Sequence, residues 1–376
     1  MRALLLSITA GQGHHATGNA VKDTFEKMGI ECKMIDAYEY IAPLLKDALA
    51  NGYILTSSYT PKVFGQWYKM AIKRNSIEDR FSFMKFSHSV LSNGIDSIIS
   101  EWQPDAIVCT HVLSAGLANA LREKQHTNAL TAGIITDFTI HPFWEDLKHI
   151  DYFVTPHEEI AYQGKKRGID IKKMLPTGIP IDGKYSKSIE KKQAREMLGL
   201  DPDMATVLVM SGSMGYGRID KVIQMIDSID IPFQGLVVCG NNKAAFNRII
   251  KLNTKKDFKV FGYVDNVDLM MDAADCIITK PGGITSSEAI EKELPMIMVN
   301  PIPGQEIMNA EFLKNIGVAM YANDNFTVDE ALHIFLSDRR RVENIRECIN
   351  REGKKNASEN FCRFIIEECE KRKSIL

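Results

Sequence analysis

Short apolar runs alternate with longer amphipathic stretches along the whole chain. In the first half the apolar runs lie at residues 3–9, 31–35, 106–110, 132–136 and 152–155, and in the second half at 206–210, 235–239, 259–261, 276–279 and 296–299. Strands that alternate with helices in this way build parallel sheets with helices on both faces. The pattern therefore predicts an α/β protein.

The alternation stops and restarts near the middle of the chain. Residues 175–183 carry two prolines and two glycines, and a lysine-rich stretch follows. We expect an N-terminal Rossmann-like domain over residues 1–180, a C-terminal Rossmann-like domain over 181–345, and a charged helix over 346–376 that packs back on the molecule. Two such sheets face each other across a cleft, and ligands bind at the carboxyl ends of the strands.

Composition narrows the class of protein. With 45% hydrophobic and 25% charged residues, the chain is that of an ordinary globular protein. The net charge of −2 is spread evenly over the two halves, which argues against a nucleic-acid-binding domain held by bulk charge. Seven scattered cysteines without a CxxC pair, and the lack of a membrane-spanning apolar run, predict a cytoplasmic protein.

A glycine turn after the first strand admits two interpretations. Gly11-Gln12-Gly13-His14-His15-Ala16 fits the dinucleotide pattern G-x-G-x-x-[GA], and Asp36 follows about 20 residues later, so an NAD-dependent oxidoreductase is one hypothesis. His14, however, places an imidazole at the opening of a helix, and near neutral pH an imidazole accepts a proton from a hydroxyl. The second interpretation makes His14 a general base and His15 a helix cap.

The strongest constellation lies in the second half, where a strand runs into Lys280-Pro281-Gly282-Gly283 and then a helix. The unpaired N–H groups of the helix start suit a diphosphate, and the glycines let a phosphate approach the backbone. Thr285-Ser-Ser-Glu288 fits a capping box that only stabilises the helix. Alternatively, the Glu288 carboxylate accepts the two hydroxyls of a ribose.

Further loops of the second half follow strands as well. Residues 211–217 are glycine-rich and offer backbone donors to a diphosphate. Gly262 to Val264 end a strand where main-chain groups can read a base edge. The amide and carboxylate of Gln305 and Glu306 suit sugar hydroxyls. Asp201-Pro-Asp203 precedes a strand, and we interpret it as a turn rather than a metal site.

Aromatic and basic residues gather in residues 61–88, either as part of a core or as a membrane-binding segment. Such a mixture is typical of segments that bind an anionic membrane surface. The predicted membrane interface comprises Phe64, Trp67, Tyr68, Lys69, Lys73 and Arg74.

Taken in order, these motifs resemble those of the diacylglycerol glycosyltransferases, the family of monogalactosyldiacylglycerol synthases and processive diacylglycerol β-glucosyltransferases. The lipid-linked N-acetylglucosamine transferase of peptidoglycan synthesis is a more distant relative. The resemblance covers nearly the whole chain, at residues 11–14, 109–111, 135–144, 177–180, 211–217, 261–263, 278–283 and 303–306. It implies two Rossmann-like domains in the GT-B arrangement.

The resemblance also implies roles for individual residues. His14 matches the proposed general base of the family, and His111, Asp137 and Trp144 match positions at the acceptor site or cleft. The implied donor contacts are the uracil at Gly262, Tyr263 and Val264, the ribose at Glu288, the diphosphate at Gly212, Ser213, Met214, Gly215, Gly282, Gly283, Ile284 and Thr285, and the sugar at Gln305 and Glu306.

We therefore expect an inverting hexosyltransferase that moves glucose or galactose from a UDP-sugar to diacylglycerol. It requires no cofactor and no metal, and it works at the inner face of the cell membrane. Processive addition is an option. The sequence departs from the plant pattern at Lys280-Pro-Gly-Gly-Ile284, which leaves the sugar open. Alternatives are a UDP-sugar epimerase, an N-acetylglucosamine transferase with a polyprenyl-linked acceptor, a UDP-sugar sensor and, ranked below the first two, the NAD-dependent oxidoreductase.

Overall fold

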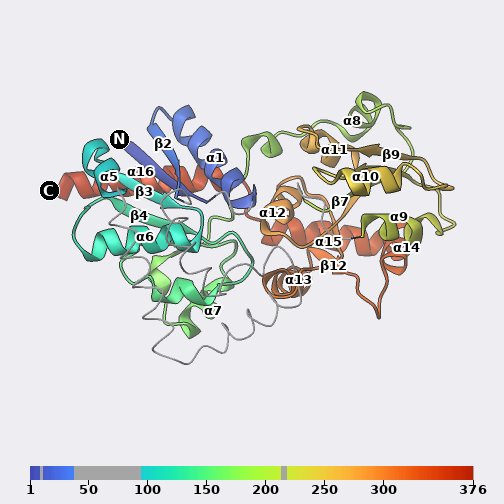
Figure 1. Ribbon diagram of the computed structural model, residues 1–376. Coiled ribbons are helices and arrows are strands. Elements are labelled where there is room, and N and C mark those ends of the chain that lie inside the picture. The colour runs from blue at the N-terminus through green and yellow to red at the C-terminus, as the bar shows by residue number, and fades with distance from the viewer. Residues whose placement is uncertain (9–11, 38–94, 213–217, 376) are drawn as a thin grey trace. The chain divides into compact units, whose positions relative to one another are not determined.

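The chain divides into two compact units in a computed structural model that describes residues 1–8, 12–37, 95–212 and 218–375. The first unit comprises Met1–Gly183, Ile302–Gln305 and Asn356–Leu376, and the second comprises Lys184–Pro301 and Glu306–Lys355 (Figure 1). Each unit is built around its own parallel six-stranded sheet. This confirms the prediction of two Rossmann-like domains.

The sheet of the first unit has the strand order β2-β1-β3-β4-β5-β6. Its central strands are fully buried because helices cover both faces, and Leu5 of β1 pairs with Met34 on one side and Val108 on the other. The strands are β1 (Arg2–Ser7), β2 (Glu31–Asp36), β3 (Ala106–Cys109), β4 (Leu130–Ile134), β5 (Tyr152–Val154) and β6 (Met174–Leu175). The helices described in this unit are α1 (Gln12–Lys27), α5 (Ile95–Trp102), α6 (Val112–Glu123), α7 (Ile160–Lys166) and α16 (Ala357–Ile375).

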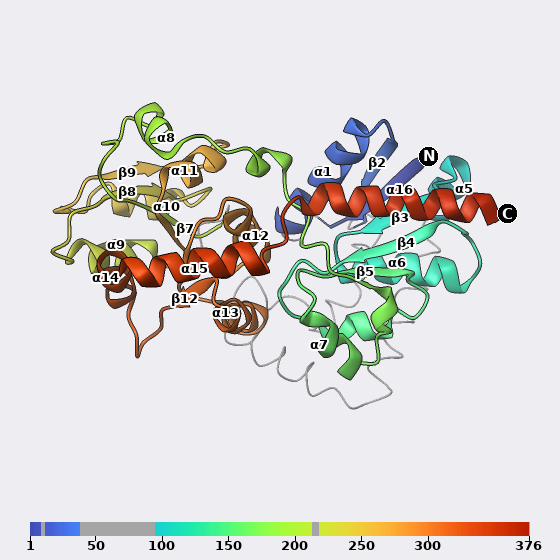
Figure 2. The same cartoon turned by 180° about the vertical axis from the view of Figure 1, so that it is seen from behind.

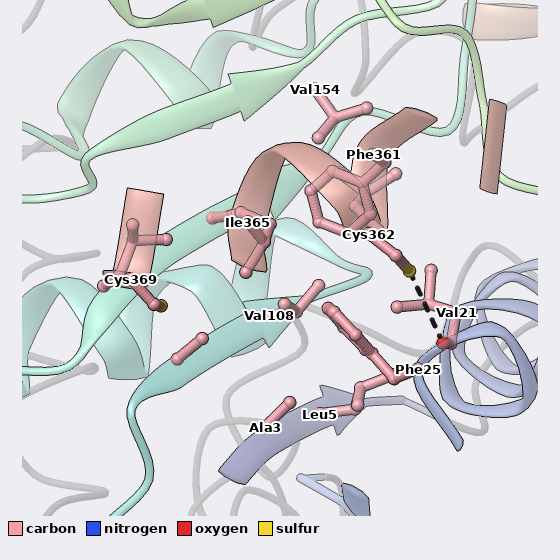
Figure 3. Close-up of a cluster of buried hydrophobic side chains, with 14 residues drawn as sticks. Ala3, Leu5, Val21, Phe25, Val108, Val154, Phe361, Cys362, Ile365 and Cys369 are labelled. Atoms are coloured by element: carbon pink, nitrogen blue, oxygen red, sulfur yellow. Dashed lines mark hydrogen bonds between the residues drawn. The ribbon is translucent and has the colours of Figure 1, made fainter. Parts of the chain in front are cut away.

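The last helix of the chain, α16, belongs to the core of the first unit. It lies along the sheet in Figure 2, and Figure 3 shows its apolar side chains facing β1, β3 and α1. The Phe361 ring is fully buried, 6.5 Å from the ring of Phe25. The other buried members that α16 contributes are Cys362, Ile365 and Cys369. The first unit is therefore completed by Asn356–Leu376, a segment that follows the second unit in the chain.

The sheet of the second unit has the order β12-β11-β10-β7-β8-β9, all strands again parallel. The strands are β7 (Thr206–Met210), β8 (Gln234–Val238), β9 (Phe258–Phe261), β10 (Cys276–Thr279), β11 (Met296–Met298) and β12 (Ala319–Tyr321). The helices are α8 (Lys191–Met197), α9 (Ile219–Asp227), α10 (Lys243–Ile249), α11 (Val267–Ala273), α12 (Gly283–Glu291), α13 (Gln305–Asn315), α14 (Val328–Ser337) and α15 (Arg339–Glu352).

The strands that sequence patterning misses are the outermost strands β6 and β12, which have two and three residues. Runs this short carry too little periodicity to stand out. The charged C-terminal stretch forms two helices rather than one, since α15 ends at Glu352 and α16 begins at Ala357. Gly353 follows α15 in an extended conformation in which a Cβ atom would overlap the carbonyl oxygen of Ile349. Within the described ranges, no helix is both long and apolar enough to cross a membrane.

Candidate active site

Each sheet has one point where the chain order reverses, and in open α/β sheets ligands bind there, beyond the carboxyl ends of the strands. In the first unit the reversal lies between β1 and β3. His14 stands in the first turn of the helix after β1, and Thr110 and His111 directly follow β3. Thr136 and Asp137 follow the neighbouring strand β4. The first unit therefore collects five chemically useful residues at one sheet edge.

The hydrogen bonds of His14 fix which of its ring nitrogens carries the proton. Nδ1 lies 2.8 Å from the backbone carbonyl oxygen of Thr110, and the hydroxyl oxygen of Thr136 lies 3.1 Å from the same nitrogen. A carbonyl oxygen can only accept, so Nδ1 is the donor. In the neutral ring Nε2 then keeps its lone pair, and a proton acceptor of this kind is what a general base requires.

The surroundings of His14 favour its neutral form. Burial lowers the pKa of His14 from its ordinary value of 6.5, and the charge of Asp137 and the bond to Thr110 oppose this shift. The ring is in edge-to-face contact with His111, with centroids 4.6 Å apart. At neutral pH the imidazole is therefore uncharged and able to accept a proton.

His111 and His141 cap short helices with their rings. The Leu113 N–H donates to Nδ1 of His111 at 3.1 Å, and the Phe143 N–H donates to Nδ1 of His141 at 3.2 Å. Burial, together with the charges of His14 and His141, lowers the pKa of His111 well below 6.5. Because its Nδ1 is an acceptor, neutral His111 carries its hydrogen on Nε2. In the sequence, His141 stands out only as a member of the motif at residues 135–144. The structure adds that its ring caps the helix at residues 142–146.

Trp144, which the resemblance places at the acceptor site or cleft, is buried against β4 and β5. Its side chain is 5% exposed and contacts the ring of Phe153 edge-on at 6.0 Å. A Cβ atom on Gly133 of β4 would come within 2.5 Å of the indole ring. The glycine makes room for the tryptophan, so Trp144 supports β4 and β5.

In the second unit the order reverses between β7 and β10, and both strands end in glycine turns. Gly212 after β7 has φ +62°, a conformation that favours glycine. Gly282 after β10 is the N-cap of α12, and no side chain caps that helix start. Among the residues that the structure describes, none has an atom within 4 Å of a Cβ atom placed on Gly282. The open space and the unpaired N–H groups are those of an anion site.

The position of the helix start tests the capping-box interpretation of Thr285-Ser-Ser-Glu288. A capping box needs Thr285 at the N-cap, but α12 begins at Gly283 and Thr285 lies inside the first turn. The capping-box interpretation is therefore wrong. Glu288 lies one to two turns into α12 and is half-buried, and its ribose role stays a prediction.

Lys280 is a residue of this site that sequence analysis passed over. Its Nζ donates to Glu306 at 2.6 Å, and both side chains are mostly buried. Its Cε would lie 3.4 Å from a Cβ atom on Gly212, so the lysine stem runs beside the other glycine turn. Asn309 of α13 holds the turn after β10, since its side-chain amide donates to the carbonyl oxygen of Pro281 at 3.0 Å. The sequence signal that could have identified Lys280 is the position of a lysine between a buried strand and Pro-Gly-Gly.

The remaining donor-site predictions fall into two groups. Gly262, Tyr263 and Val264 follow β9 at the same sheet edge, and the Tyr263 side chain is 64% exposed. Gln305 opens α13 directly before Glu306. Ser213, Met214 and Gly215 lie outside the described residues, as do Gly11 and the predicted membrane interface at Phe64, Trp67, Tyr68, Lys69, Lys73 and Arg74. In the part of the chain that is described, no three His, Cys, Asp or Glu side chains are grouped so as to hold a metal ion.

Comparisons with known proteins match two segments of the chain to two family models. Residues 14–181 match the family model of monogalactosyldiacylglycerol (MGDG) synthase, and residues 206–361 match that of the glycosyltransferase family 28 C-terminal domain. The two matches together assign the chain to the glycosyltransferases that combine an MGDG synthase domain with a family 28 C-terminal domain. It is 26% identical to a processive diacylglycerol β-glucosyltransferase of Bacillus licheniformis, over 98% of this chain and 95% of that protein.

Solved structures resemble this glycosyltransferase in fold. The crystal structure of Acinetobacter baumannii MurG gives a TM-score of 0.64 at 14% identity and covers 98% of this chain and 100% of MurG. The UDP-GlcNAc 2-epimerase of Neisseria meningitidis bound to UDP-GlcNAc gives 0.60 at 14% identity, over 98% of this chain and 100% of the epimerase. Because transferases and epimerases share the fold, the family models rather than the fold identify the chain as a glycosyltransferase.

Proposed function

We propose that the protein transfers a hexose from a UDP-sugar to the free hydroxyl of diacylglycerol with inversion, giving a β-glycosyldiacylglycerol. The observation that carries this proposal is the fixed tautomer of His14, which presents a basic nitrogen at a ligand-binding sheet edge. The names of the relatives supply the substrate class, since the Bacillus protein is called a processive diacylglycerol β-glucosyltransferase.

The donor is proposed to bind the second unit. The diphosphate accepts hydrogen bonds from the N–H groups of Gly283, Ile284 and Thr285 at the start of α12 and from the turn at Gly212 to Gly215. Uracil is read at Gly262–Val264, the ribose hydroxyls by Glu288, and the sugar by Gln305 and Glu306. The stem of Lys280 runs beside Gly212, and its ammonium group holds the Glu306 carboxylate in place.

In the reaction, Nε2 of His14 takes the proton of the acceptor hydroxyl while the hydroxyl oxygen attacks C1 of the sugar. The new bond is C1–O(acceptor), the broken bond is C1–O(phosphate), and the leaving group is UDP. Negative charge grows on the diphosphate as this bond breaks. The helix N–H groups, which are already oriented, stabilise that charge.

The acceptor is proposed to enter the first unit from a membrane surface. Asp137 favours the imidazolium that forms on His14, because its charge raises the pKa of that ring. We place the protein at the inner face of the cell membrane as a peripheral protein. The predicted interface at residues 61–88 stays a prediction.

One assay tests the proposal. Purified protein is incubated with radiolabelled UDP-glucose or UDP-galactose and diacylglycerol vesicles, and lipid products are separated by thin-layer chromatography. A labelled β-glycosyldiacylglycerol from either donor supports the proposal, and the better donor names the sugar. Interconversion of UDP-sugars without a lipid product would instead favour the epimerase, and product from UDP-N-acetylglucosamine and a polyprenyl-linked acceptor alone would favour that transferase.

A further inference from the structure

A mostly buried ion pair in the second unit joins the ends of two neighbouring strands. Lys280 directly follows β10, and Glu306 lies in the first turn of α13, the helix that follows β11. The Nζ atom of Lys280 lies 2.6 Å from Oε1 of Glu306, and the two side chains are only 20% and 14% exposed. Because β10 and β11 are parallel, both residues lie at the carboxyl edge of the sheet. This is the edge at which the donor is proposed to bind.

Further contacts hold the ion pair in place. Asn309 lies three residues after Glu306, so the two side chains are neighbours on one face of α13. Asn309 is fully buried and donates to the carbonyl oxygen of Pro281 at 3.0 Å. On the other side, the Lys280 stem passes Gly212, since its Cε would lie 3.4 Å from a Cβ atom placed there. The start of α13 is therefore tied to two consecutive residues of the turn after β10.

The ion pair orders a carboxylate that can bind a sugar. A carboxylate only accepts hydrogen bonds and has about four acceptor positions, so one that is paired with an ammonium group still accepts from hydroxyls. Hydrogen bonds to a charged acceptor are stronger than those between neutral groups. A mobile glutamate would lose part of this gain, because ordering a long side chain costs entropy. Since Lys280 holds Glu306, that ordering is complete before a ligand binds.

The position of Lys280 links the two parts of a sugar nucleotide. In such a donor the hexose is joined to the diphosphate through a single oxygen atom, so the groups that bind the two parts must keep a fixed separation. Lys280 starts at the turn proposed for the diphosphate and ends at the carboxylate proposed for the sugar. The charge of its ammonium group is balanced by that carboxylate. We therefore expect Lys280 to act through Glu306 and not directly on the phosphates.

We propose that Lys280 is a positioning residue for the donor sugar: it holds the Glu306 carboxylate where this group accepts hydrogen bonds from the hydroxyls of the hexose. The inference rests on the proposed function, in which Glu306 contacts the sugar. The uridine diphosphate is held by the glycine turns and does not need this carboxylate. Removing the ammonium group therefore weakens the binding of UDP-hexose and leaves the binding of UDP unchanged.

The test compares the affinities for UDP and UDP-hexose, measured by calorimetry on the full chain. The hexose is glucose or galactose, whichever the wild type binds more tightly. In Lys280→Met we expect the affinity for UDP-hexose to fall by about tenfold, because a hydrogen bond to a charged group is lost, while that for UDP stays within about twofold. Lys280→Arg keeps a cation beside Glu306 and should recover most of the loss.

Lys191→Met is the matched control. Nζ of Lys191 lies 2.8 Å from Oδ1 of Asp275, and these side chains are 33% and 24% exposed. Asp275 directly precedes β10 and Lys280 directly follows it, so the control removes an ammonium group from an ion pair at the opposite end of the same strand. Its affinities for UDP and UDP-hexose should equal those of the wild type. Circular dichroism melts check that every variant is folded.

The double variant Lys280→Met/Glu306→Gln tests whether the lysine acts through the glutamate. If it does, the double variant binds UDP-hexose no more weakly than Glu306→Gln alone, because residues that act as a unit are not additive. Losses that multiply in the double variant would overturn the proposal. So would unchanged UDP-hexose affinity in Lys280→Met, or an equal loss for UDP, which would assign the ammonium group to the diphosphate.

A failure of the proposed reaction is seen in a different measurement. It appears as the absence of a lipid product from the wild type, whereas the role of Lys280 is read from the affinities for UDP and UDP-hexose without an acceptor. The two failures are therefore distinguishable.

Discussion

The Nδ1 atom of His14 lies 2.8 Å from the carbonyl oxygen of Thr110, a residue 96 positions further along the chain. The bond joins the helix after β1 to the end of β3 at the point where the order of the first sheet reverses. Since the carbonyl can only accept, the bond sets the tautomer and leaves Nε2 basic. The same strand ends are tied by the Thr110 hydroxyl, which donates to the Ser7 hydroxyl at 3.2 Å.

Replacing His14 by Ala removes the proposed base. We expect turnover of UDP-sugar with diacylglycerol to fall by roughly 10² to 10⁴, because general base catalysis contributes about that much. UDP affinity, measured by calorimetry, should stay near that of the wild type. His126→Ala is the control, since that side chain is 45% exposed and pairs with Asp96. Full turnover in His14→Ala would remove the histidine from the mechanism.

Asp137→Asn should move the pH profile. His14 must be neutral to act, so kcat/KM falls as the pH falls through its pKa, which burial places below 6.5. The charge of Asp137 raises that pKa, so removing the charge lowers it further. The acid limb of kcat/KM should therefore shift to lower pH, and activity at pH 5.5 relative to pH 7.5 should increase. A shift to higher pH would contradict the assignment of the limb to His14.

Thr136→Val removes a hydroxyl 3.1 Å from Nδ1 of His14 while keeping the shape of the side chain. One neutral hydrogen bond contributes about 1 kcal/mol, so we expect kcat to fall by roughly fivefold. Thr136→Ser keeps the hydroxyl and should retain most of the activity. If Val and Ser behave alike, the hydroxyl does not help to position the ring.

Gly282→Ala separates binding from stability. The new methyl group meets no atom of the described residues within 4 Å and φ is −78°, so the melting temperature should not change. The methyl group does enter the space proposed for the diphosphate, and we expect UDP affinity to fall about tenfold or more, ~1.4 kcal/mol. Gly235→Ala is the contrasting variant, because its methyl group would overlap the Phe258 ring and destabilise the fold. Unchanged UDP affinity in Gly282→Ala would place the diphosphate elsewhere.

Phe361→Ala tests the role of α16 in the first unit. The side chain is fully buried beside Phe25, and truncating such a phenylalanine costs about 3 to 5 kcal/mol. Urea denaturation should show this loss in the free energy of unfolding. Glu359→Ala, on the exposed face of the same helix, should stay within about 0.5 kcal/mol of the wild type. A loss below about 1 kcal/mol for Phe361→Ala would mean that α16 adds little to the core.

The buried apolar runs determine the two sheets. Strands such as Thr206–Met210 and Cys276–Thr279 are buried throughout and mostly apolar because parallel strands are covered on both faces. The glycine turns after them suit the close approach that a phosphate requires. Periodicity and turn residues are local signals, so the sequence alone predicts these elements and the residue types at their ends. His14, Gly282 and Glu288 are predicted as site residues in this way.

Only the tertiary structure decides which distant residues contact the residues that local patterns predict. The Thr110 carbonyl selects the tautomer of His14, Glu306 pairs with Lys280, and α16 completes a sheet that starts at residue 2. Each of these contacts joins residues far apart in the chain, and no periodicity records its partner. The helix start at Gly283 rather than Thr285 is decided in the same way, because the turn after β10 sets where α12 begins. Local pattern fixes the elements, and long-range packing fixes their chemistry.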